Sequence, residues 1–331
     1  GLSRIGHREL TSTRHYNYPS NGGEGVRVYL LDTGINQNHY DFEDRVSVGP
    51  MLAKESRWGD IDNHGTPVAG IIAGAKYGIA KKAQIISIQV LGDKNTGDTE
   101  TIIEALNWVS EEQQKHPGMS WAQKRGRRSV KANCGVCNSM SLAIPTSHLV
   151  DMTIERLAQQ NITIVAAAGN GDPYGKSLDA CIGSPASARL SITVGSSDST
   201  DKAVSYSNYG RCVTLFAPGI DIISTSAENR TGYCIKSGTS MAAPFVTGVA
   251  ANILGQYGPL PPQKLREIII QLATPGVIKN IHDPDTPNRL LYASMAQEVP
   301  TAEGAITAAT LPFFGNAAIA VIVAVFSQSF I

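Results

Sequence analysis

The chain has 331 residues with 28 basic and 28 acidic side chains, so its formal net charge is zero. This balance excludes the chain-wide basic surface that a nucleic-acid partner requires. Hydrophobic residues make up 42% of the chain and charged residues 17%, which excludes intrinsic disorder. We therefore expect a folded, enzyme-sized protein.

Short apolar runs alternate with helical stretches along the first 295 residues. Strands that alternate with helices favour an α/β fold with a mostly parallel sheet and helices on both faces. The predicted strands are 26–31, 85–91, 162–168, 192–195 and 213–216, and the predicted helices are 99–114, 147–160, 239–257 and 262–273. Within 147–160, the apolar stripe is formed by Leu149, Met152, Ile154 and Leu157.

Three reactive side chains lie beside glycine at the ends of apolar elements. Asp32 ends the first predicted strand in LLDTG, His64 opens a helical run in NHGTPVAG, and Ser240 opens an apolar helix in SGTSMAAP. In an open parallel sheet, the carboxyl ends of strands and the starts of helices meet at one edge. A serine needs a base, histidine titrates near neutrality, and a buried carboxylate orients the imidazole. The three residues therefore predict a nucleophilic triad.

A developing oxyanion needs hydrogen-bond donors close to the nucleophile. Ser240 at a helix start has free backbone N–H groups and a favourable helix dipole around it. Asn170 ends a predicted strand in AAAGN and can donate a second hydrogen bond from its amide. The sequence thus predicts acyl-transfer chemistry at this edge of the sheet.

With these motifs, the sequence resembles the subtilisin-like serine proteases and, within them, the proteinase K group. The resemblance implies a three-layer subtilisin-like α/β fold over residues 1–295 and a secreted, monomeric endopeptidase acting on proteins or peptides. It implies the roles of triad acid for Asp32, base for His64, nucleophile for Ser240 and oxyanion donor for Asn170. The matching segments, in order, are VYLLDTGI, DNHGTPVAG, YGIAKKAQIISIQVL, VAAAGN, SPAS, SYSNYG, LFAPG and SGTSMAAP.

The resemblance also implies a groove whose two extended walls pair with the substrate backbone. Here the walls depart from the family pattern, because Ala143, Ile144 and Asn95 stand where glycine is usual, and Pro145 lacks a backbone donor. These changes motivate an alternative, a protease-like binding protein with an intact triad and a closed groove. The residues implied to bind substrate are Asn95, Thr96, Gly97, Ser141, Leu142, Ala143 and Gly169.

The five cysteines are an odd number, so at least one thiol has no partner within the chain. The resemblance implies a disulfide between Cys181 and Cys212. Cys134 and Cys137 form a lone CxxC, which predicts two loop cysteines rather than a zinc site. Cys234 is then left to one of that pair or to solvent.

Two sequons, at Asn161 and Asn229, agree with a secreted, disulfide-permissive chain. The first residues, 1–5, lack the apolar run of a signal peptide. Relatives use an inhibitory pro-segment for folding, and we expect none within this chain.

A structural calcium site is implied by the resemblance but is weakened by one substitution. Thr214 stands where relatives carry an aspartate ligand, so only backbone carbonyls near Arg189 and Ser191 remain. Hard cations favour carboxylates, so the sequence argues against calcium here. We expect no required cofactor and no catalytic metal.

The last segment, 296–331, is set apart as a small-residue spacer followed by an apolar tail. Residues 311–326 carry no charge, and small residues over 301–310 precede them. This order resembles the signal for a glycolipid anchor, which would attach the protein to the cell surface. A membrane helix is an alternative, although the run is short and begins beside Pro312, and a core or surface helix is another.

Overall fold

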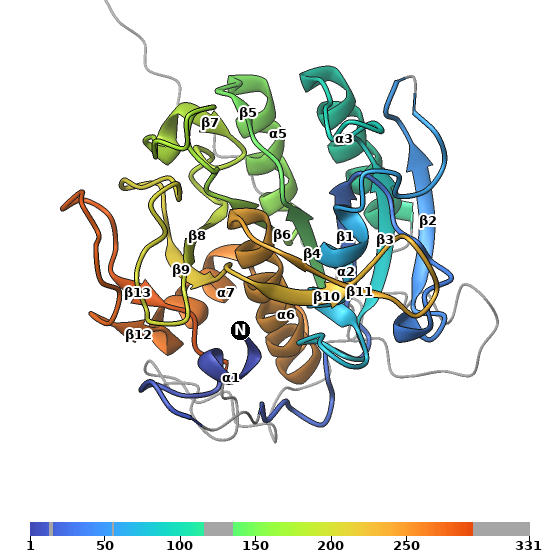
Figure 1. The fold of residues 1–331 in the computed structure, drawn as a ribbon. Coiled ribbons are helices and arrows are strands. Elements are labelled where there is room, and N and C mark those ends of the chain that lie inside the picture. The colour runs from blue at the N-terminus through green and yellow to red at the C-terminus, as the bar shows by residue number, and fades with distance from the viewer. Residues whose placement is uncertain (13–15, 55, 116–134, 294–331) are drawn as a thin grey trace, which may run out of the picture. The chain divides into compact units, whose positions relative to one another are not determined.

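The computed structural model describes residues 1–12, 16–54, 56–115 and 135–293. Within these residues, nine strands form one sheet in the order β12-β13-β9-β8-β6-β4-β1-β3-β2 (Figure 1). Neighbouring strands run parallel except for the antiparallel pair β12–β13 at one edge. The strands are β1 (Arg27–Asp32), β2 (Val46–Met51), β3 (Gln84–Gln89), β4 (Val136–Met140), β6 (Ile162–Ala167), β8 (Ile192–Ser197), β9 (Leu215–Pro218), β12 (Thr274–Pro275) and β13 (Arg289–Leu290).

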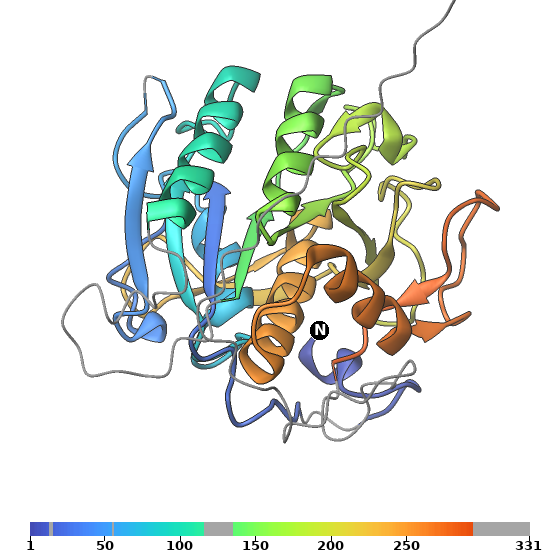
Figure 2. The same cartoon turned by 180° about the vertical axis from the view of Figure 1, so that it is seen from behind.

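Helices cover both faces of this sheet, which makes three layers (Figures 1 and 2). One face packs against α2 (Gly65–Ala73), α6 (Thr239–Tyr257) and α7 (Pro262–Leu272), and the other against α3 (Thr99–Lys115) and α5 (His148–Gln159). Smaller elements are α1 (Leu2–Ile5), the pair β5 (Ile144–Pro145) and β7 (Gly183–Ser184), the hairpin β10 (Ile222–Thr225) and β11 (Tyr233–Lys236), and two short 3-10 turns, η1 (Tyr40–Phe42) and η2 (Ala180–Ile182).

Strand β1 shows why the central strands read as continuous apolar runs. Val28 and Leu30 belong to the core cluster beneath α2 and α6, whereas Tyr29 and Leu31 belong to the cluster beneath α3 and α5. All four side chains are fully buried. Because a strand covered on both faces has no solvent side, its hydrophobicity does not alternate. The expected α/β fold with three layers is confirmed.

The central strand β4 was absent from the predicted elements, and this is a correction. Cys137, Asn138 and Ser139 are each fully buried in it, so Cys137 is not a loop residue. Their mildly polar character interrupts the apolar run that predicts a buried strand. Burial raises the pKa of the Cys137 thiol to about 12. Cys134 lies outside the described residues.

The predicted apolar stripe of α5 is half wrong. Ile154 and Leu157 are fully buried, but Leu149 is 58% exposed and Met152 66% exposed. The buried face begins instead at Val150 and continues through Ile154 and Leu157, with spacings of four and three. Leu149 lies 100° away from Val150 around the helix, and that rotation carries it to the solvent side.

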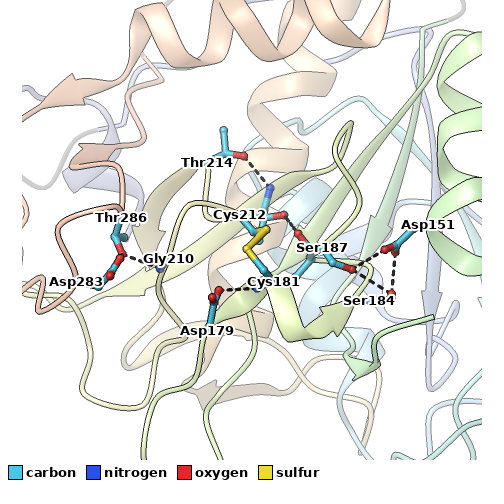
Figure 3. The surroundings of a disulfide bond; sticks show 12 residues. Asp151, Asp179, Cys181, Ser184, Ser187, Gly210, Cys212, Thr214, Asp283 and Thr286 are labelled. Atoms are coloured by element: carbon cyan, nitrogen blue, oxygen red, sulfur yellow. Dashed lines mark hydrogen bonds between the residues drawn. A yellow bond between two sulfur atoms is a disulfide. The ribbon is translucent and has the colours of Figure 1, made fainter. Parts of the chain in front are cut away.

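The disulfide between Cys181 and Cys212 is confirmed, with 5.3 Å between the two α-carbons (Figure 3). It links η2 to the turn that precedes β9, and the side chain of Asp179 accepts a hydrogen bond from the Cys181 N–H. In the described part of the chain, Cys234 remains a free, half-buried thiol. Both sequon asparagines, Asn161 and Asn229, are exposed.

Over the described ranges, none of the helices combines the length and the apolar character that crossing a membrane requires. The tail at 296–331 lies outside those ranges, so its three interpretations stay predictions.

Candidate active site

The acid and the base of the expected triad are in direct contact. Asp32 is the last residue of β1, and His64 immediately precedes the first residue of α2. Nδ1 of His64 lies 2.7 Å from Oδ1 of Asp32. The same carboxylate oxygen accepts a hydrogen bond from the N–H of Thr33. Asp32 is 1% exposed, so its charge acts on the imidazole with little screening by solvent.

A second acid, Asp60, holds the loop that carries His64. Its Oδ1 accepts hydrogen bonds from the Thr33 hydroxyl at 2.7 Å and the His64 N–H at 3.1 Å. Its Oδ2 accepts one from the Thr66 N–H at 2.7 Å. Sequence reasoning missed Asp60, although an acid four residues before the reactive histidine was a usable signal. Its effect is to fix the backbone of the base relative to β1.

The surrounding charges set the pKa of His64. Burial is the largest influence and by itself lowers this pKa, because a buried imidazolium loses hydration. The negative charge and hydrogen bond of Asp32 act in the opposite direction, as do the charges of Asp60 and Asp62. Together the three acids prevail, and the pKa of His64 lies above its usual value of 6.5.

Ser240 lies in the first turn of α6, close to the wall of the expected groove. Its hydroxyl donates to the carbonyl of Ser141 at 3.1 Å, and the Ser141 hydroxyl donates back to the Ser240 carbonyl at 3.0 Å. In this conformation the hydroxyl proton is directed at Ser141 rather than at His64. The hydroxyl must therefore give up its hydrogen bond to Ser141 before His64 can accept the proton.

Asn170 is oriented by the residue that precedes the serine. Its Oδ1 accepts hydrogen bonds from both the N–H and the hydroxyl of Thr239. With the carbonyl side of the amide engaged, Nδ2 is the group left to donate to a substrate oxygen. Gly169 allows this turn, because its φ is +103° and a Cβ there would lie 2.4 Å from Nδ2 of Asn208.

These residues converge on one pocket of about 390 Å³. His64, Asn170 and Ser240 line it together with every residue that the sequence assigned to substrate binding. The additional lining residues, which sequence reasoning did not assign to substrate binding, are Leu91, Ile144, Pro145, Ala167 and Thr239. Two of them, Ile144 and Thr239, directly flank a predicted site residue, so sequence adjacency was a usable signal for these two.

Residues 23–292 match the sequence model of the Subtilase family. The chain belongs to this family. The subtilase is 36% identical over 304 residues to the subtilisin-like serine protease Pen c 2 of Penicillium citrinum, and 36% identical over 305 residues to subtilisin-like protease 3 of Saccharomyces cerevisiae. Each alignment covers 88% of the subtilase, and they cover 64% and 60% of the two relatives, so the chain spans less than two thirds of these relatives.

A solved structure is similar over the same extent. The crystal structure of a cold-adapted subtilisin-like serine proteinase superimposes with a TM-score of 0.77 and 35% sequence identity. The match covers 88% of the subtilase and 97% of that chain.

The altered wall of the subtilase leaves its pocket open. Ile144 and Pro145 form β5, which pairs with Gly183 and Ser184 of β7, and the Ile144 side chain packs against the core beneath α3 and α5. Pro145 therefore does not prevent this segment from pairing within the protein. On the opposite wall, Asn95 adopts a φ of +57°, a left-handed conformation that asparagine tolerates better than most residues.

The expected calcium position does not fit a metal ion. Thr214 is 1% exposed, and two arginine side chains reach it. Nη2 of Arg266 lies 3.4 Å from its hydroxyl oxygen, and Nη1 of Arg289 lies 3.5 Å from its carbonyl oxygen. Burial and the nearby charge of Arg289 both lower the pKa of Arg266. Two guanidinium groups at the place of a lost carboxylate repel a divalent cation, so no step of the chemistry is assigned to calcium.

Proposed function

We propose that this subtilase is a secreted serine endopeptidase that hydrolyses peptide bonds of proteins or peptides through an acyl-enzyme. One observation carries the proposal: His64, Ser240 and Asn170 line a single open pocket, and Asp32 holds His64 from the buried side. Membership of the family supports the same chemistry.

In the proposed mechanism, His64 is the general base. Because Nδ1 keeps its proton and donates a hydrogen bond to Asp32, Nε2 carries the lone pair that accepts the Ser240 proton. The Ser240 hydroxyl turns from Ser141 to His64, and Oγ then attacks the scissile carbonyl carbon. Asp32 keeps the tautomer fixed and stabilises the imidazolium that forms. The imidazolium protonates the leaving amine, and a water molecule activated by His64 hydrolyses the resulting ester.

The tetrahedral intermediate carries its negative charge on the former carbonyl oxygen. Nδ2 of Asn170 is the side-chain donor available for it, since its Oδ1 is engaged by Thr239. The second donor is the backbone N–H of Ser240, because N–H groups in the first turn of a helix have no partner within the helix. Both donors are in place before the charge develops, so little reorganisation is needed.

The alternative is a binding protein whose groove is closed to substrate. The open pocket and the inward packing of Ile144 support the enzyme instead. Ala143 is exposed at the pocket and its single methyl group fills little of it.

A serine-reactive fluorophosphonate tests the proposal, with Ser240→Ala as the matched control. We expect rapid labelling of the wild type, cleavage of unfolded casein, and neither reaction in Ser240→Ala. If the folded wild type labels no faster than Ser240→Ala, the enzyme proposal is wrong. If it labels but cleaves neither casein nor peptides, the closed-groove alternative is correct.

We further propose that the protein is exported and held at the cell surface by a glycolipid anchor. The Cys181–Cys212 disulfide and the exposed asparagines of both sequons support export. The order of small residues and apolar tail over 301–326 supports the anchor. Phosphatidylinositol-specific lipase should release the protein from cells. Retention on the membrane, in cells where a known anchored protein is released, would contradict the anchor.

A further inference from the structure

A second hollow of about 370 Å³ borders the two loops that carry Asp32 and His64. Its walls are the loop 34–38 that follows Asp32, the loop 58–61 that precedes His64, and parts of β2 and β3. We call it the Trp58 pocket. The proposed mechanism uses none of its exposed side chains.

Several large apolar side chains around the Trp58 pocket are exposed to solvent. Trp58 is 61% exposed, Ile61 43% and Val48 40%, and all three line it. Single exposed apolar residues are ordinary, but several gathered around one concave site mark a binding surface. Tryptophan adds a large rigid face with little rotamer entropy to lose on binding.

The loop that carries Trp58 is anchored on both sides of this residue. Before it, Nε2 of Gln89 donates to the Ser56 hydroxyl at 2.8 Å and to the Arg57 carbonyl at 2.9 Å. After it, the Asp60 carboxylate accepts three hydrogen bonds. The pocket is thus preformed, which reduces the entropy lost when a ligand binds.

Two walls of the Trp58 pocket, the loops 34–38 and 58–61, also contact each other through their backbones. Gly34 has a φ of +103°, and a Cβ on it would lie 2.9 Å from the backbone of Gly59. The loop after Asp32 and the loop before His64 are therefore packed backbone to backbone. An occupant of the Trp58 pocket would contact the same two loops that position the acid and the base.

The chemistry of the lining selects a neutral occupant. Of the described residues that line the pocket, Asp60 is the one with a charged side chain, and both of its oxygens are already engaged by donors. Gln37 and Asn38 present exposed amide side chains, which both donate and accept hydrogen bonds. An apolar side chain flanked by backbone amides matches this combination, and an ion does not.

We propose that the Trp58 pocket is a secondary binding site for the polypeptide substrate and takes an apolar side chain outside the segment held in the groove. The inference rests on the proposed function and adds a preference for long substrates. The two sites are continuous through one loop, because Asp60 and Ile61 line the Trp58 pocket and His64 lines the groove. The proposed path of a long substrate leaves the groove past His64 and follows this loop to the Trp58 pocket.

Hydrolysis of two substrates tests the inference: a four-residue fluorogenic peptide amide, which fills the groove alone, and unfolded casein. For Trp58→Ala we expect kcat/KM for casein to fall about tenfold through KM, the change that corresponds to about 1.4 kcal/mol of binding. Val48→Ser should also lower kcat/KM for casein. The short peptide should be hydrolysed at the wild-type rate. Tyr40→Ala is the matched control, because Tyr40 is also 61% exposed but does not line the pocket.

A binding measurement separates this inference from the proposed function. In the Ser240→Ala background, which cannot turn over substrate, calorimetry with a 20-residue casein peptide reports affinity alone. We expect Trp58→Ala to weaken this affinity about tenfold and Tyr40→Ala to leave it unchanged. If the wild type hydrolyses nothing, the proposed function is wrong. The affinity measurement still shows whether the Trp58 pocket binds the peptide.

Two results would overturn the inference. Equal losses on the short peptide and on casein would mean that Trp58 acts through the structure of the His64 loop. Unchanged casein hydrolysis and peptide affinity would mean that the substrate does not reach the pocket. If Trp58→Ala then abolishes self-association in sedimentation velocity, the occupant is a second copy of the chain.

Discussion

Thr239 donates both its backbone N–H and its hydroxyl to Oδ1 of Asn170, at 2.8 and 2.9 Å. The two bonds connect the residue before the candidate nucleophile to the candidate oxyanion donor. Because Oδ1 is engaged twice, the amide cannot turn without losing both bonds. The start of α6 therefore fixes the orientation of Asn170 as well as the position of Ser240.

Removal of the Asn170 amide should weaken the transition state far more than substrate binding. For Asn170→Ala we expect kcat to fall by about 10²–10³, or about 2.7–4 kcal/mol, a range known from the equivalent change in subtilisin itself. Thr239→Val should cause a smaller loss of kcat, since one of the two orienting bonds remains. Steady-state kinetics on a peptide amide measure both variants. A loss confined to KM would contradict the oxyanion role.

The pH profile of activity should depend on Asp62. The proposed reaction requires neutral His64, and the pKa of His64 lies above 6.5, so activity should fall on acidification from a point above that pH. Asp62 contributes a negative charge that favours the imidazolium. Asp62→Asn should lower this pKa and move the acidic limb of kcat/KM to lower pH. The control is Asp285→Asn, which removes the charge of another surface acid and should leave the acidic limb of kcat/KM unchanged. If Asp285→Asn shifts the limb as much as Asp62→Asn does, the effect does not come from the charge of Asp62 near His64.

Calcium should have little effect on stability. Arg266 and Arg289 bring two positive charges to Thr214, where a metal ion would otherwise need a carboxylate. The unfolding temperature in excess calcium should therefore equal that in a chelator, with magnesium as the control for ionic strength. A rise of several degrees that is specific to calcium would show that the protein binds this ion at another place.

The Cys181–Cys212 disulfide should contribute measurably to stability. Its cysteines are 31 residues apart, and closing a loop of this size corresponds to about 3–4 kcal/mol in the chain-entropy description. The double variant Cys181→Ala/Cys212→Ala should lower the unfolding temperature by about 5–15 °C. Cys234→Ser is the matched control, because Cys234 is a free thiol and its change should alter this temperature little. If Cys234→Ser lowers the unfolding temperature as much as the double variant does, the loss comes from altered packing rather than from the missing disulfide.

The candidate site could be proposed from the sequence because its residues are local features. Asp32, His64 and Ser240 each end or begin an apolar element beside glycine, and the parallel topology brings such ends together at one edge. Asp60 was harder to predict, since its role depends on three donors that surround it only in the folded loop.

Strand β4 and helix α5 mark where the pattern of the sequence was insufficient. Asn138 and Ser139 read as polar residues, yet both are completely buried in β4, where Thr247 of α6 donates a hydrogen bond to the Ser139 hydroxyl. Leu149 and Met152 read as core residues, yet they lie outside the buried face of α5 that Val150, Ile154 and Leu157 form. Hydrophobic periodicity records the average preference of a segment, whereas burial is decided by what packs against it.

By itself, the sequence determined the α/β class, the family and the four residues proposed for catalysis, because these follow from short motifs and the order of elements. The tertiary structure decided three further properties: an open groove despite Ile144, two arginines at Thr214, and the Trp58 pocket beside the His64 loop. Each depends on side chains that are distant in sequence and meet only when the sheet and its loops are assembled. A local sequence pattern therefore cannot predict these contacts.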